Sequence, residues 1–159
     1  MILSYPGSSV LDIDDPQLTQ LRRSIIQEKR LLHAIYQEWY HLQITQLPSI
    51  SGMILEIGSG AGFLQEVQGQ LITTEVRFYP FVNAILDARR LPFSNDCLRA
   101  IVMTDVFHHI PNVEEFLYEA WRTLRPGGRV IMIEPWVTPW SLWIMQHFHS
   151  EAMNAEMLT

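Results

Sequence analysis

The stretch ILEIGSGAGFL, residues 54–64, decides the fold class. It joins a short apolar run, 53–57, to three closely spaced glycines, Gly58, Gly60 and Gly62. The apolar run is bounded by turn residues and is typical of a buried strand, while the glycines allow a ligand to approach the backbone closely. A helix that begins after such a turn presents unpaired N–H groups to an anionic group. The stretch therefore predicts a strand, a ligand-binding turn and a helix, in that order.

Working outward from this stretch, the chain alternates predicted helices and strands. Asp15 and Pro16 predict the start of an amphipathic helix over about 16–45, whose apolar residues recur at spacings of three, four or seven. A second helix is expected after Gly62, ending near Gly69, and a third after the capping-box pair Asn112 and Glu115. The segment Pro126 to Gly128 is expected to end the third helix. Further strands are expected at 71–76, 83–88, 98–104 and 129–134.

This alternation predicts an α/β fold with a mainly parallel sheet and helices on both faces. A length of 159 residues allows one domain, 1–159. We divide that domain into an N-terminal helical segment, 1–50, a core, 51–134, and a tryptophan-rich tail, 135–159.

Composition excludes several classes of protein. Apolar residues make up 48% of the chain and charged residues 18%, which argues against disorder. The net charge of −6 argues against a nucleic-acid partner, because a phosphate backbone attracts positive charge. Cys97 is the single cysteine, so no disulfide within the chain is expected. Without a signal-peptide pattern or a long apolar run, we expect no transmembrane segment and a cytoplasmic location.

Acidic side chains follow two of the other predicted strands. Glu75 ends the strand after the glycine-rich turn, where an acid can accept the hydroxyls of a ribose. Asp87 and Ala88 end the next strand, where a carboxylate can accept an adenine amino group. Each feature also has a structural explanation: a tight turn without ligand, an exposed carboxylate, or an aspartate that caps its own backbone. The dinucleotide pattern G-x-G-x-x-G would need glycine at Phe63, which argues against NAD.

Five ordered motifs are LEIGSGAG, the acid that closes the second strand, DARRLPF, IVMTDVFHHI and LRPGGRVIMIEP. In this order the chain resembles, over about 53–134, the class I S-adenosylmethionine-dependent methyltransferases, particularly the small-molecule group called type 11. The resemblance implies a Rossmann-like fold, S-adenosylmethionine as cofactor, and methyl transfer to a small-molecule acceptor.

The resemblance also implies roles for individual residues. Glu56 would orient the methionine amino group, and Glu75 would hold the ribose. Asp87 with Ala88 would recognise adenine, and Thr104 would lie near the sulfonium and the acceptor. The methionine part would be lined by Gly58, Ser59 and Gly60. Because little room remains between the second and third strands for the family's usual helix, the adenine wall would come instead from Arg77, Phe78 or Tyr79.

Two adjacent histidines are the candidates for a catalytic base. His108 and His109 follow the fourth strand, and histidine is the side chain that most often acts as a general base. The alternative is that this pair belongs to the fold. A metal site is not expected, because neighbouring residues on a turn rarely both reach one ion without further ligands.

The end of the chain raises a question of completeness. Related methyltransferases add a hairpin of two strands after the fifth strand, and 135–159 lacks a pattern for it, so the chain is interpreted as truncated. The uncovered edge of strand 129–134 predicts a homo-oligomer formed through that edge and the tail. The tail itself could be core, substrate lid or membrane-surface segment. Two other functions stay open: a catalytically silent relative that binds the cofactor or a partner chain, and an NAD(P)-binding oxidoreductase.

Overall fold

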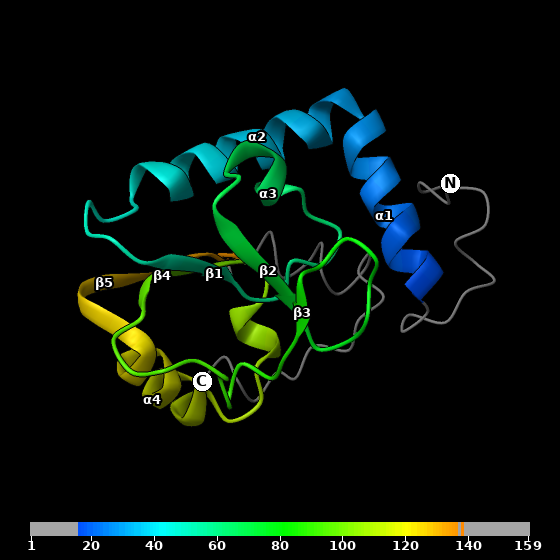
Figure 1. The fold of residues 1–159 in the computed structure, drawn as a ribbon. Helices are drawn as coiled ribbons and strands as arrows, with labels where there is room; N and C mark the ends of the chain where they lie inside the picture. Colours follow the sequence, from blue (N-terminus) through cyan, green and yellow to red (C-terminus); the bar gives the residue numbers. More distant parts are fainter. Residues whose placement is uncertain (1–15, 137, 139–159) are drawn as a thin grey trace.

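The computed structural model describes residues 16–136 and 138, and its centre is a five-stranded sheet in the order β3-β2-β1-β4-β5 (Figure 1). All four strand pairs are parallel. The strands are β1 (Met53–Glu56), β2 (Leu71–Glu75), β3 (Ala84–Ile85), β4 (Leu98–Thr104) and β5 (Leu124–Ile133). The helices are α1 (Pro16–Glu28), α2 (Arg30–Thr45), α3 (Leu64–Val67) and α4 (Val113–Thr123), with a 3-10 turn, η1, at Phe107–His109. The predicted α/β fold with a parallel sheet is confirmed.

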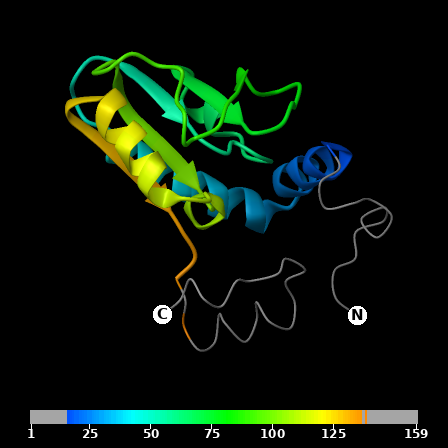
Figure 2. The same cartoon turned by 90° about the horizontal axis from the view of Figure 1, so that it is seen from below.

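Successive apolar side chains of the central strands point to opposite faces of the sheet and form a core on each face. Leu55, Ile101 and Met103 are fully buried among residues that include Phe116 of α4. Ile54 and its neighbours on the opposite face pack with residues of the helices α1 to α3. Helices α1, α2 and α3 accordingly lie on one side of the sheet and α4 on the other (Figures 1 and 2). Burial on both faces explains why these strands are almost continuously apolar.

The strand order places a topological switch between β1 and β4. From β1 the chain moves outward through β2 and β3, and it then returns to build β4 and β5 on the other side of β1. In open α/β sheets, ligands bind at the carboxyl ends of the strands beside such a switch. The glycine-rich turn follows β1 at this point, and Thr104 ends β4 beside it.

Several predicted boundaries were wrong in detail. The helix expected over 16–45 is divided into α1 and α2 at Lys29, whose backbone is extended. The expected capping box is absent, because Asn112 has a left-handed φ of 56° and makes no side-chain cap hydrogen bond. Helix α3 spans Leu64–Val67 alone, and β3 is reduced to Ala84–Ile85.

The fifth strand begins earlier than expected. Helix α4 ends at Thr123, before Pro126 and the glycines that were expected to end it, and Leu124 already pairs with Leu98. The register then shifts, and regular pairing resumes at Arg129. The PGG segment is therefore an irregularity inside β5, a use of glycine that helix-stop rules do not distinguish from a cap.

Strand β5 pairs with β4 on one side and is the last strand of the described sheet. The expected absence of a hairpin after β5 and most of the tryptophan-rich tail concern residues outside 16–136 and 138, so the oligomer through this edge stays a prediction. Within the described part of the chain, no helix is long and apolar enough to span a membrane.

Candidate functional site

The turn after β1 has a backbone that requires glycine at its first position. Gly58 has a φ of +65°, and a Cβ atom there would lie 2.5 and 2.7 Å from the two methyl groups of Val106. Gly60 has a φ of +45°, also in the left-handed region. Residues that carry a Cβ atom rarely adopt such φ values, so the glycines permit both the turn and the close contact with the segment after β4.

Glu56 lies buried at the start of this turn. Its side chain accepts a hydrogen bond of 2.8 Å from Ser59 Oγ, and the Thr74 hydroxyl donates to the Glu56 carbonyl at 2.6 Å. Burial raises the pKa of the Glu56 carboxyl to about 7, against the lowering effects of the Ser59 hydrogen bond and of Arg23. The carboxylate form is therefore costly here, and a cation bound beside it would lower that cost.

Glu75 reaches the same turn from the end of β2. Its Oε1 atom accepts a hydrogen bond of 2.9 Å from Gly60 N, and its Oε2 atom accepts one of 3.0 Å from Val76 N. Glu75 also raises the pKa of Glu56 by electrostatic repulsion. Glu56, Gly58, Ser59, Gly60 and Glu75, all chosen from the sequence, thus lie together at one edge of the sheet.

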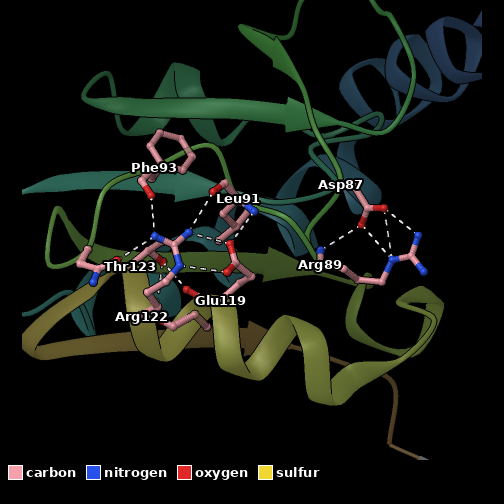
Figure 3. Close-up of polar contacts among 9 residues, drawn as sticks. Asp87, Arg89, Leu91, Phe93, Glu119, Arg122 and Thr123 are labelled. Atoms are coloured by element: carbon pink, nitrogen blue, oxygen red, sulfur yellow. Dashed lines mark hydrogen bonds and ion pairs between the residues drawn. The ribbon is translucent and has the colours of Figure 1, made fainter.

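Asp87 makes a different set of contacts. Its carboxylate binds the Arg89 guanidinium, with Oδ2 2.7 Å from Nη2, and accepts the Arg89 backbone N–H at 2.9 Å (Figure 3). These bonds to Arg89 lower the pKa of Asp87. Ala88 is buried in the core on the α4 face, which leaves its backbone rather than its methyl group for any ligand contact. Of the proposed adenine-wall residues, Tyr79 is buried and Phe78 is 69% exposed.

The loop after Asp87 is anchored to α4 by a polar network (Figure 3). Arg122 donates hydrogen bonds to the carbonyl oxygens of Leu91 and Phe93 at 3.0 and 2.8 Å, and it forms an ion pair with Glu119. Glu119 in turn accepts the Leu91 N–H at 2.7 Å. Its bonds to Arg122 lower the pKa of Glu119. The network fixes the LPF segment of the DARRLPF motif, which the sequence alone had not explained.

Thr104 and the two histidines lie at the carboxyl end of β4. Thr104 Oγ1 accepts a hydrogen bond of 3.1 Å from Gln43 of α2. His108 Nδ1 lies 2.6 Å from Glu134 Oε2, just beyond β5, and the ring of His109 is 4.0 Å from that of His108. Glu134 was missed at the sequence level, although its place directly after a parallel strand is a usable signal.

Helix α2 supplies a second missed contact, to the far side of the glycine-rich turn. The buried Tyr40 hydroxyl accepts a hydrogen bond of 3.0 Å from Phe63 N, and a Cβ atom on Gly62 would lie 2.5 Å from that hydroxyl. His33 stacks on Phe63, and Arg23 of α1 donates to the Gly62 carbonyl. We call Arg23, His33 and Tyr40 the turn clamp. The sequence alone gives no sign that Tyr40 contacts the glycine-rich turn.

Comparison with known proteins gives matches to methyltransferases. The family model for the methyltransferase domain matches residues 55–132. A ubiquinone/menaquinone biosynthesis C-methyltransferase from Bartonella bacilliformis is 37% identical over 57 residues, which are 36% of this chain and 21% of that protein. A phthiotriol/phenolphthiotriol dimycocerosates methyltransferase from Mycobacterium leprae is 26% identical, over 75% of this chain and 54% of that protein. The chain thus spans between about a fifth and about half of these relatives.

Solved structures share the fold at low sequence identity. A protein from Methanococcus maripaludis, described as an S-adenosyl-L-methionine-dependent methyltransferase, superposes with a TM-score of 0.62 and 17% identity, over 84% of this chain and 72% of that one. A geranyl diphosphate C-methyltransferase from Streptomyces coelicolor, solved with S-adenosyl-L-homocysteine, gives 0.55 and 14%, over 86% and 61%. Residues 55–132 therefore match the methyltransferase-domain family model, and the fold of the chain is similar to that of S-adenosylmethionine-dependent methyltransferases.

Proposed function

We propose that the chain binds S-adenosylmethionine at the turn after β1 and directs transfer of its methyl group to a small organic acceptor. The observation that carries this proposal is the hydrogen bond from the backbone N–H of Gly60 to the Glu75 carboxylate. An acidic side chain held at the carboxyl end of β2, against a glycine-rich turn, offers carboxylate oxygens to the two hydroxyls of a ribose.

The residues around this turn suit the cofactor's charges. Burial raises the pKa of the Glu56 carboxyl to about 7, and a cationic amino group bound beside it would lower that pKa and favour the carboxylate. Charge and a hydrogen bond would then together hold the amino group. The turn between Glu56 and Glu75 would receive the rest of the methionine part through Gly58, Ser59 and Gly60. Asp87 would share its carboxylate between Arg89 and the adenine amino group.

When bound, S-adenosylmethionine supplies a methyl group on a good sulfonium leaving group. The chain therefore needs chiefly to hold the acceptor in line, and such orientation is worth about 7 to 11 kcal/mol of barrier. Thr104, at the end of β4, is proposed to lie close to the acceptor.

His108 is proposed as the group that removes a proton from an acceptor hydroxyl. The bond from Nδ1 to Glu134 would fix its ring and leave Nε2 to accept that proton. His109, the other histidine of the pair, is the alternative base.

The acceptor class is suggested by the relatives. The names of the two relatives above include ubiquinone, menaquinone and phthiotriol dimycocerosates, and the first is a C-methyltransferase. A third relative, a mitochondrial ubiquinone biosynthesis O-methyltransferase from Rattus norvegicus, adds oxygen methylation. A small organic molecule with a nucleophilic ring carbon or hydroxyl is therefore the acceptor we propose. The test is incubation with S-adenosylmethionine and a panel of hydroquinones and catechols, followed by mass spectrometry. Methylated product supports the proposal, whereas cofactor binding without any transfer favours the silent relative.

Replacement of Glu75 with alanine is expected to weaken S-adenosylmethionine binding at least tenfold, about 1.4 kcal/mol, because the ribose loses its acceptors. Isothermal titration calorimetry measures this change. Glu114→Ala is the matched control, since Glu114 is an exposed acid in the first turn of α4. Unchanged affinity in Glu75→Ala would remove Glu75 from the site.

A further inference from the structure

We propose that Asp105, His108 and Glu134 bind a divalent transition-metal ion beside the methyl-acceptor position. Asp105 and His108 come from the segment after β4, and Glu134 comes directly after β5. One ligand atom from each residue lies within 4.8 Å of the other two, and His108 Nδ1 is 2.6 Å from Glu134 Oε2. Ligands around one ion, at bonds of about 2.0 to 2.2 Å, lie about 3 to 4 Å apart, so small side-chain adjustments suffice.

The backbone holds the two arms of this cluster in place. In the parallel pairing of β4 with β5, Thr104 lies opposite Ile133, and Asp105 N donates to the Ile133 carbonyl at 2.8 Å. Glu134 Oε1 accepts hydrogen bonds from the backbone N–H groups of Val106 and Phe107, at 3.0 and 2.8 Å. These two bonds fix the Glu134 carboxylate and direct its other oxygen to His108. Second contacts of this kind orient the ligands of metal sites.

The donor set selects the kind of ion. One imidazole nitrogen with two carboxylates suits Zn²⁺, Mn²⁺ and other first-row metals, whereas Mg²⁺ and Ca²⁺ prefer oxygen alone. Asp105 and His108 are exposed, and the Glu134 side chain is 21% exposed, so coordination positions would face solvent or an acceptor. The expectation of no metal site rested on the histidine pair alone, and Glu134 is the further ligand that it lacked.

A catalytic role for the cation rests on the proposed function. A hydroxyl bound to a divalent cation in this site would lose its proton to solvent at lower pH, and its oxygen would then be the stronger nucleophile toward the methyl group. With the ion bound, His108 is a ligand and the cation replaces it as the activating group. Cation binding itself does not depend on methyl transfer, so the two can fail separately.

The test is calorimetric titration of the chelator-treated full chain with Zn²⁺ and with Mn²⁺, in the absence of S-adenosylmethionine. One ion per chain is expected. His108→Ala and Glu134→Gln are each expected to weaken binding at least tenfold, while the amide of Glu134→Gln keeps an oxygen for the two backbone N–H groups. His41→Ala, which removes an exposed histidine on α2, is expected to bind as the unmodified chain does.

Two results would overturn the proposal: no saturable binding of either ion, or equal affinity in the unmodified chain and in His108→Ala. Circular dichroism of each variant establishes that its fold is intact. Calorimetry with S-adenosylmethionine on the unmodified chain separates this proposal from the proposed function, since absence of metal binding there with retained cofactor binding rejects the cation site alone.

Discussion

Replacing Gly62 with alanine is expected to lower the free energy of unfolding by about 1 to 3 kcal/mol, because an overpacked contact forces its neighbours to move. The new Cβ would lie 2.5 Å from the Tyr40 hydroxyl and 3.0 Å from the Ser59 carbonyl oxygen. Tyr40 belongs to the turn clamp and Ser59 to the turn after β1 itself. Displacement of these atoms would change the shape of the turn, so S-adenosylmethionine affinity is expected to fall at least tenfold. Urea unfolding and calorimetry measure the two effects.

A second replacement tests the cause of this effect. In Tyr40→Phe the hydroxyl is absent, and the nearest remaining ring atom, Cζ, is 3.7 Å from the position of the Gly62 Cβ. Tyr40→Phe alone loses the bond from Phe63 N, so it is also destabilising. The double variant is expected to be more stable than the sum of the two single effects, by about 0.5 to 3 kcal/mol.

Gly69→Ala is the control for this series. No atom lies within 4 Å of a Cβ at Gly69, so its stability is expected to change by less than about 0.5 kcal/mol. Strict additivity of Gly62→Ala and Tyr40→Phe would show that the turn clamp does not contact the turn as described.

The second large effect concerns pH and Glu56. Its folded-state pKa of about 7 lies above the ordinary value of 4.5, so the folded state binds a proton more tightly than the unfolded state does. The resulting stability is fully present below pH 4.5 and is lost as the pH rises through about 7. The loss is on the order of 3 kcal/mol, at 1.36 kcal/mol for each pKa unit.

Glu56→Gln removes this titration and keeps an oxygen for the Ser59 hydroxyl. The free energy of unfolding of the unmodified chain, relative to Glu56→Gln, is therefore expected to decrease between pH 5 and pH 8. Glu114→Gln, which changes an exposed acid, is expected to follow the unmodified chain. A difference between the unmodified chain and Glu56→Gln that stays constant over this range would contradict the burial and raised pKa of Glu56.

The sheet and the glycine-rich turn could be predicted because their signals are local. Apolar runs marked β1, β2 and β4, and the glycines with Glu56 and Glu75 occupy strand ends that a parallel sheet necessarily brings to one edge. The errors have local causes too. Extended backbone at Lys29 divides a helical pattern that is otherwise continuous, and left-handed Asn112 replaces the expected cap.

Contacts between distant segments could not be predicted. Tyr40 contacts Phe63, which is 23 positions away in the sequence, because α2 packs against the sheet. Glu134 contacts His108, which is 26 positions away, because β5 pairs with β4. Arg122 likewise binds the loop at Leu91 through the docking of α4. A single sequence gives residue types for such pairs and no measure of their distance, so the turn clamp and the proposed cation site emerged from the structure.

The most direct test of the central claim is calorimetric titration of the chain with S-adenosylmethionine, S-adenosylhomocysteine and NADH under one set of conditions. We predict saturable binding of the two sulfur nucleosides at one site per chain, with mutual competition, and no binding of NADH. Binding of NADH without binding of either sulfur nucleoside would contradict the account.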